Sequence, residues 1–163
     1  MLKILLPVDG SEASLEAVRH ALRLVQNGLA ATFVLANVQT SATLYEMVTA
    51  HDPDVLDQVS TAAGAHALEP AEAILDGAGV EWEREIGSGD PARVLVEMIE
   101  RHGVDAVVMG TRGLGAATSA LVGSVSHWLL QHGPVPVTVV RHVVADSDTG
   151  ADDEPDRRVP DAV

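Results

Sequence analysis

The 163-residue sequence has no cysteine, one lysine and only four aromatic residues, Phe33, Tyr45, Trp82 and Trp128. The lack of cysteine excludes disulfides, cysteine-bound zinc, iron–sulfur clusters and thiol catalysis. Aromatic side chains are too few to form a stacking surface for single-stranded nucleic acid, and the core is expected to consist of Ala, Val, Leu and Ile. No apolar run approaches the roughly 18 residues that cross a bilayer, so no membrane partner is expected.

Positive charge is scarce as well, with 10 Lys and Arg against 24 Asp and Glu and a formal net charge of −14. Nucleic-acid binding needs a basic surface, which this sequence lacks. Residues 146–163 hold seven acids, two arginines and no apolar period. We therefore expect one domain at residues 1–142 and an acidic, disordered tail at 143–163. With no cysteine and no signal peptide before Asp9, we expect a cytoplasmic protein.

The apolar pattern predicts that strands and helices alternate along the chain. Strands are expected at 2–8, 31–38, 80–86, 104–109 and 136–141, helices at 11–27, 53–77, 91–102 and 124–132, and a loop at 39–52. Ser11 or Ser14 is expected to cap the first helix and Asp90 the third, whereas Pro70 is expected to kink or break the second. This alternation predicts a three-layer α/β fold, with an open parallel five-stranded sheet covered by helices on both faces.

Residues that suit an anion gather after the fourth predicted strand. Gly110 and Gly113 follow that strand, and after nine further residues Gly123 and Ser124 begin a helix. Glycine lets the backbone approach a bulky anion and take positive φ, and a helix N-terminus favours negative charge. Arg112 adds a positive side chain. Because ligands of open parallel sheets bind beyond the carboxyl ends of the strands, where strand order reverses, the pattern predicts a phosphate site there.

Several segments together give the sequence a familiar signature. They are residues 4–11 (ILLPVDGS), 87–92 (GSGDPA), 107–115 (VVMGTRGLG), 123–126 (GSVS) and 134–141 (PVPVTVVR). In these segments the chain resembles the universal stress protein family over about residues 1–142. The two glycine elements have the spacing of the ATP-binding branch of that family. The resemblance thus implies a stress-response protein.

The resemblance also implies a fold, a ligand and a partner. The fold is a flavodoxin- or Rossmann-like sheet of order 3-2-1-4-5, with ATP or AMP, accompanied by Mg²⁺ or Mn²⁺, across the ends of strands one, two and four. Adenosine contacts would come from Pro7, Asp9 and Val38. Phosphate contacts would come from Gly110, Arg112, Gly113, Gly123, Ser124 and Val125. The family forms homodimers, here through the fifth strand with Val137 and Val139, which would make the protein a nucleotide-dependent signalling or interaction module.

Taken without the resemblance, the same residues have simpler interpretations. The glycine pattern also fits an ordinary connecting loop, and Arg112 a solvated position in it. Asp9 also fits the N-cap of the first helix, or a water-mediated contact with nucleotide-bound metal. Gly87, Gly89 and Ala92 imitate a dinucleotide fingerprint, but a helix start capped by aspartate explains them better.

Catalysis has little support in the sequence. There is no Walker motif, nucleophile elbow or Ser/His/Asp set, so no catalytic residue is assigned. The seven histidines contain no His-x-x-x-His pair, and no metal held by protein side chains alone is expected. Two alternatives to a binding module stay open, a slow Mg²⁺-dependent ATPase in the same pocket and a dimeric scaffold that binds no nucleotide.

Overall fold

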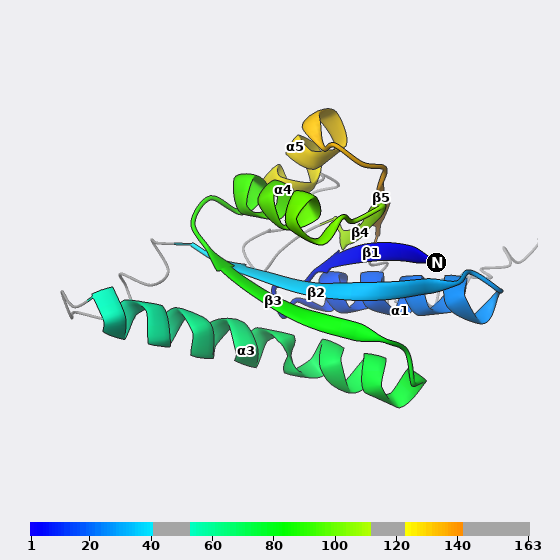
Figure 1. Cartoon of the computed structure of the whole chain (residues 1–163), viewed down its shortest axis with the longest axis horizontal. Coiled ribbons are helices and arrows are strands. Elements are labelled where there is room, and N and C mark those ends of the chain that lie inside the picture. Colours follow the sequence, from blue (N-terminus) through cyan, green and yellow to red (C-terminus); the bar gives the residue numbers. More distant parts are fainter. Residues whose placement is uncertain (41–52, 112–122, 142–163) are drawn as a thin grey trace, which may run out of the picture.

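The computed structural model describes residues 1–40, 53–111 and 123–141. Its five strands form one parallel sheet of order β3-β2-β1-β4-β5, which confirms the predicted fold class and strand order. Most of the predicted loop at 39–52, the loop that follows Thr111 and the acidic tail lie outside the described residues. In chain order the elements (Figure 1) are β1 (Leu2–Pro7), α1 (Glu12–Gln26), β2 (Ala31–Gln39), α3 (Pro53–Ala78), β3 (Trp82–Ser88), α4 (Pro91–His102), β4 (Ala106–Gly110), α5 (Ser124–His132) and β5 (Val137–Val140).

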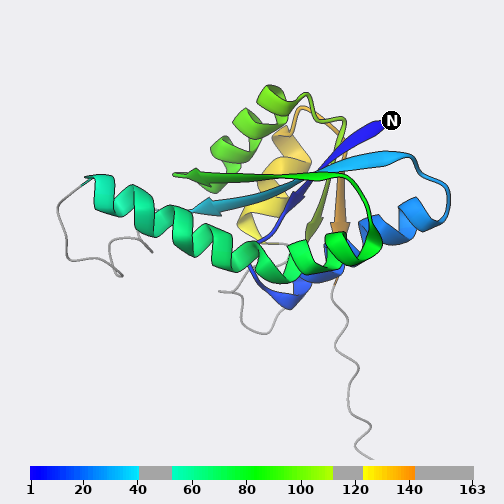
Figure 2. The ribbon, with the colours of Figure 1, turned by 60° about the horizontal axis from the view of Figure 1, so that its bottom comes forward.

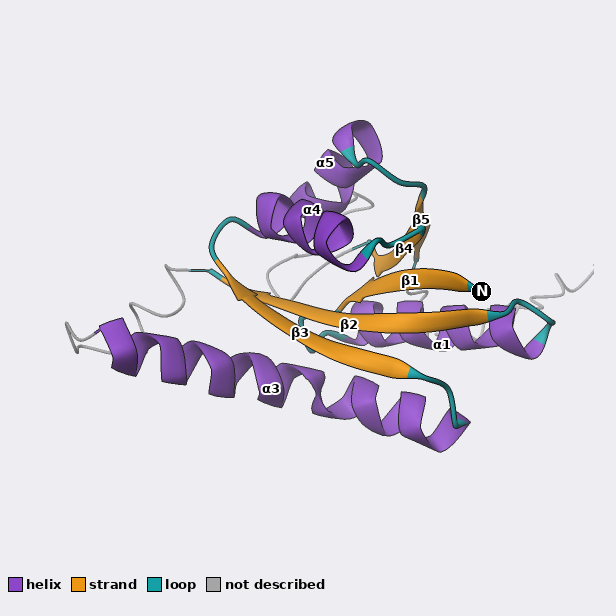
Figure 3. Ribbon diagram, in the orientation of Figure 1, coloured by secondary structure: helices purple, strands orange, loops and turns teal. Residues whose placement is uncertain are grey.

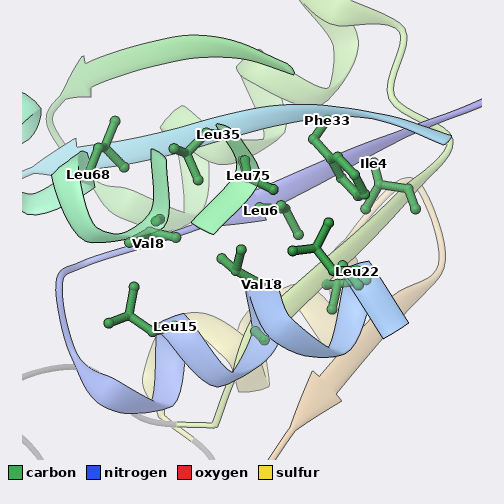
Figure 4. Close-up of a cluster of buried hydrophobic side chains, with 14 of the residues drawn as sticks. Ile4, Leu6, Val8, Leu15, Val18, Leu22, Phe33, Leu35, Leu68 and Leu75 are labelled. Carbon is green, nitrogen blue, oxygen red and sulfur yellow. The ribbon is translucent and has the colours of Figure 1, made fainter. Parts of the chain in front are cut away.

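Helices cover both faces of this sheet, α1 and α3 on one and α4 and α5 on the other (Figure 3). Alternate strand residues therefore enter different hydrophobic clusters: Leu6 packs with α1 and α3, and Leu5 with α4 and α5. Figure 4 shows the first cluster, in which Val18 and Leu22 of α1 gather beneath β1. Apart from Phe33, the buried hydrophobic residues of the described part are aliphatic or methionine, as the composition predicts.

The starts of α1 and α4 are fixed by side chains that the sequence analysis selected. Ser11 is the N-cap of α1, and its hydroxyl accepts a hydrogen bond from the Ser14 amide at 3.2 Å. Asp90 is the N-cap of α4, and its carboxylate accepts from the Arg93 amide at 3.0 Å. Each cap satisfies an amide that has no partner within its helix. Both helices thus begin at the carboxyl edge of the sheet.

Of the kink or break predicted at Pro70, the break does not occur, because α3 continues through this residue. Proline deprives the His66 carbonyl of its helical partner. His66 and Pro70 are both exposed, so water can reach that carbonyl, while Leu68 and Ala71 are buried and anchor the helix on either side. Figure 2 shows α3 changing direction part-way along its length, as expected when one helical hydrogen bond is lost. Neither α3 nor any shorter helix of the described ranges combines the length and apolarity needed to cross a membrane.

Two strand starts differ from the prediction by two residues. β4 begins at Ala106, not at 104, because the Val104 amide donates to the Ile99 carbonyl at 3.0 Å and closes the last turn of α4. Gly103, in the left-handed region at φ 59°, makes this closure possible. β3 begins at Trp82 and extends to Ser88, beyond the predicted end, because its last residues pair with β2. The periodicity therefore located both strands but not their exact limits.

The two edges of the sheet differ in charge. On β3, Glu83 contacts Lys3 at 3.2 Å and His102 at 3.2 Å, and Arg84 contacts Glu72 at 2.6 Å. Partial burial acts to raise the pKa of Glu83, but the hydrogen bond from Lys3 and the charge of His102 outweigh it and lower that pKa below its usual value. β5, in contrast, has the uncharged sequence VTVV. Charged side chains protect an edge from pairing with another chain, and β5 lacks them.

Candidate functional site

The candidate site lies at the carboxyl ends of β1, β2 and β4. β1 pairs with β2 on one side and with β4 on the other, so strand order reverses between β1 and β4. Open parallel sheets bind ligands at such a reversal. The described site residues that the sequence analysis selected belong to these strand ends or to the helix starts beside them. Arg112 and Gly113 lie outside the described residues.

Asp9 stabilises the turn that follows β1 but is not the N-cap of α1. Its carboxylate accepts a hydrogen bond from the Ser11 amide at 3.0 Å, while Ser11 itself provides the N-cap. Gly10, between them, has φ +84°, a backbone conformation that residues other than glycine rarely adopt. The N-cap interpretation of Asp9 is therefore wrong. The turn instead holds this half-buried carboxylate at the end of β1.

The hydrogen-bond ladder between β1 and β2 ends in an unusual way. Its last rung runs from the Val8 amide to the Ala36 carbonyl at 2.8 Å. The Val8 carbonyl accepts from the Asn37 side-chain amide at 2.7 Å, and Gln39 donates to the Asn37 side-chain oxygen at 2.7 Å. In a regular parallel ladder the Val38 amide would donate to the Val8 carbonyl. Within the described part of the chain, no hydrogen bond reaches the main-chain groups of Val38 from the β1 side.

Gly110, the last residue of β4, is required by the packing of this strand on α1. A Cβ atom on Gly110 would lie 2.5 Å from the Ala13 carbonyl oxygen and 3.0 Å from the Ser14 nitrogen. Both contacts are with backbone, which has little freedom to move away. Gly110 is not among the glycines with positive φ, so the conformational reason offered from the sequence is wrong for this residue. Close packing is the reason that the structure gives.

The start of α5 is fastened to the end of β4. The Gly123 amide donates to the Thr111 carbonyl at 2.5 Å, and the buried Ser126 hydroxyl donates to the Gly110 carbonyl at 3.0 Å. The helix begins at Ser124, where the sequence predicts a helix start, and its N-cap Gly123 has no side chain to cap it. The amides of the first turn thus form a positive helix end beside β4, an arrangement that suits an anion.

Apolar residues at these strand ends and at the start of α5 belong to one hydrophobic cluster. Val38 of β2, Met109 of β4 and Val125 of α5 all belong to the hydrophobic cluster under α4 and α5. Pro7 is half-buried at the end of β1. The sequence analysis did not select Met109, although it is the last apolar residue before the first glycine element.

Two further polar residues were missed. Asn37 is buried, with 3% of its surface exposed, and no sequence motif distinguishes it. Arg141 directly follows β5, whose last residue, Val140, accepts a hydrogen bond from the Thr111 amide at 3.0 Å. The carboxyl ends of parallel strands lie at one edge, so Arg141 adds a cation one strand away from β4. The signal for it was its position at the end of the fifth predicted strand.

Other residues that could be taken for site residues have structural roles in the described part of the chain. A Cβ atom on Gly87 would lie 2.5 Å from the Val94 side chain, so glycine here lets α4 pack closely on β3. Asp90 is the N-cap of that helix. Trp128 stacks on His132 of the same helix, with ring centroids 4.9 Å apart. No group of three His, Asp or Glu residues within the described ranges is arranged to hold a metal ion.

Comparison with known proteins identifies the relatives of this chain. The model of the universal stress protein family matches residues 1–141. The chain belongs to the universal stress protein family. Two curated family members are similar over most of their length: one from Methanocaldococcus jannaschii, 30% identical over 85% of this chain and 81% of its own, and YxiE of Bacillus subtilis, 31% identical over 85% and 98%. The match confirms the resemblance that the sequence motifs carry.

Solved structures agree with this fold. The structure of the hypothetical protein MJ0577 superimposes with a TM-score of 0.72 at 24% identity, covering 88% of this chain and 98% of its own. A universal stress protein family protein from Arabidopsis thaliana, solved with AMP bound, gives a TM-score of 0.64 at 24% identity over 93% and 97% of the two chains. A universal stress protein in complex with cAMP gives 0.61 at 24% identity over 85% and 96%.

Proposed function

We propose that this protein binds an adenine nucleotide, ATP or AMP, at the carboxyl ends of β1, β2 and β4, and acts as a cytoplasmic, dimeric, nucleotide-dependent module in a stress response. The observation that carries the proposal is that the end of the β1–β2 ladder, with the main chain of Val38, and the start of α5 lie on the two sides of one strand reversal. The folded module would be residues 1–142, followed by an acidic tail. Family membership and the relatives solved with AMP and cAMP support the choice of nucleotide.

The adenosine end would use β1 and β2. Adenine presents a hydrogen-bond donor beside an acceptor, and one residue's main-chain amide and carbonyl complement that pair. The main-chain groups of Val38 point to the β1 side, where the ladder has ended. Val38 and Pro7 would flank the base, and the Asp9 carboxylate would accept ribose hydroxyls or hold water on a nucleotide-bound Mg²⁺ or Mn²⁺.

The phosphate end would use β4 and α5. The amides of Ser124 and Val125 lie at the positive end of a helix, which attracts phosphate oxygens, and Gly123, whose own amide donates to the Thr111 carbonyl, would let the phosphate approach them. In this proposal Gly110, Arg112 and Gly113 complete the phosphate contacts. The net charge of −14 opposes a triphosphate, so a metal ion is expected to strengthen ATP binding more than AMP binding.

Nucleotide binding is tested by mass spectrometry of the protein purified without added nucleotide, first native and then denatured, followed by calorimetric titration with AMP and with Mg²⁺-ATP. We expect one adenine nucleotide per chain in at least one of these measurements. Phosphate release that Asp9→Ala abolishes, with binding retained, would instead indicate a slow ATPase. Absence of both co-purified nucleotide and binding heat would leave a nucleotide-free scaffold and overturn the proposal.

Dimerisation is proposed through the uncharged edge of β5. The Val107 amide donates to the Pro136 carbonyl and the Thr111 amide to the Val140 carbonyl, so even-numbered residues of this strand face β4. The main-chain groups of Val137 and Val139 therefore point outward. A second copy could pair with them and extend the sheet.

Val139→Lys is expected to convert the dimer into a monomer, because two copies would bring like charges together at the shared edge. Light scattering over a range of concentrations measures the mass. Glu81→Lys, which changes a charge near the opposite edge, is the control and is expected to leave the mass unchanged. A Val139→Lys protein that keeps the mass of two chains would show that the interface lies elsewhere.

A further inference from the structure

The end of the β1–β2 ladder is organised by one buried side chain. Asn37 is 3% exposed, and its side-chain amide group forms hydrogen bonds with two groups inside the protein. Its nitrogen donates to the Val8 carbonyl and its oxygen accepts from Gln39. A buried polar group of this kind is costly unless it is satisfied, and here its orientation is set by Gln39.

The helix above it leaves room for this arrangement. Gly64 of α3 lies over Asn37, and a Cβ atom on Gly64 would be 3.1 Å from the Asn37 side-chain oxygen and 2.6 Å from Ile86. A Cβ atom on Gly10, just after β1, would lie 3.6 Å from the Ala67 carbonyl oxygen of the same helix. The backbone that leaves β1 and the Asn37 amide therefore share the α3 side of the sheet.

The bond to Val8 changes what the next residue of β2 offers. The Val8 amide donates to the Ala36 carbonyl, and the Gly89 amide to the Gln39 carbonyl, so even-numbered residues of β2 face β1 and odd-numbered residues face β3. By this alternation the Val38 amide would form the next rung to the Val8 carbonyl. Asn37 supplies a donor to that carbonyl instead.

We propose that Asn37 is the positioning residue of the adenosine end. Its side chain donates to the Val8 carbonyl in place of the Val38 amide, so the main-chain amide and carbonyl of Val38 remain available to a ligand. This inference rests on the proposed function. Asn37 does not touch the nucleotide in this scheme. It acts through Val8, at the residue where β1 gives way to the Asp9 turn.

Two replacements test the idea, and each has a specific readout. In Asn37→Leu the Val8 carbonyl loses its side-chain donor, and the Val38 amide is the next main-chain donor on that side. We expect AMP affinity to fall at least tenfold by calorimetry. We also expect the Val38 amide to exchange with solvent more slowly in the nucleotide-free variant than in the nucleotide-free wild type, as measured by NMR. Loss of stability alone would speed that exchange.

Gln39→Leu is the milder variant, because it leaves Asn37 in place and removes only the donor that orients it. We expect a smaller loss of AMP affinity, about threefold, and this variant serves if Asn37→Leu does not fold. Asn27→Leu is the matched control: Asn27 is exposed at the end of α1, where its side chain donates to the Arg23 carbonyl. It should change neither AMP affinity nor the exchange of the Val38 amide.

The outcomes separate this inference from the function on which it rests. A wild-type protein that binds no adenine nucleotide overturns the proposed function, and this inference with it. A wild-type protein that binds AMP, together with folded variants that bind AMP within twofold of it, overturns only the role of Asn37. Slow exchange of the Val38 amide in the nucleotide-free wild type also overturns that role, because it would mean that the rung is already closed.

Discussion

Replacing Gly110 by alanine is expected to lower the free energy of unfolding by about 1–3 kcal/mol, the usual cost of forcing extra volume into a packed interior. The added methyl group would lie 2.5 Å from the Ala13 carbonyl oxygen. Either β4 or the first turn of α1 must then move. Both movements disturb the strand reversal at the candidate site. Urea denaturation of the two proteins measures the difference.

Gly77→Ala is the matched control for this substitution. Gly77 lies in α3, and a Cβ atom there would meet nothing within 4 Å. Alanine favours a helix more than glycine does, by up to about 1 kcal/mol in a helix interior, so this variant is expected to be as stable as the wild type or more so. If both glycine replacements changed stability equally, packing against α1 would not be the reason for glycine at position 110.

The sequence predicted those features that depend on neighbouring residues. The alternation of strand and helix patterns along the chain indicated a parallel sheet covered by helices, and the dipeptide Asp90–Pro91 indicated a helix start with a cap. Ser11 was one of two candidates for the cap of α1, and the structure selects it. These features are local because a helix cap or a buried strand is determined by a few consecutive side chains. The order of the strands came from the family resemblance.

Features that depend on contacts between distant segments were not predicted. Gly110 was assigned to positive φ and to close approach of an anion, but its constraint in the structure is Ala13, nearly a hundred positions earlier in the chain. Asn37 was not noticed, because its partner is the Val8 carbonyl of another strand. Pro70 was expected to kink or break its helix, and buried residues on both sides of it keep that helix continuous. In each case tertiary packing, which a single sequence does not display, decided the outcome.

The phosphate end of the site is best tested by charge at its helix start. Gly123 has φ −59° and ψ 157°, a conformation open to any residue and normal for an N-cap. Asn and Asp are both good N-caps and have nearly the same shape, so Gly123→Asn and Gly123→Asp should be as stable as the wild type within a few tenths of a kcal/mol. They differ in one negative charge. Thermal unfolding of the two variants checks this equivalence.

With stability matched, the two variants should differ sharply in binding. The carboxylate introduced by Gly123→Asp would accept from the first-turn amides that the phosphate is proposed to use, and it would repel the phosphate. We expect AMP affinity at least tenfold below that of Gly123→Asn, about 1.4 kcal/mol, by calorimetry. The difference should shrink as salt is added, because ions screen the repulsion. Equal affinities at low salt would remove the start of α5 from the phosphate site and leave the adenosine end to be tested on its own.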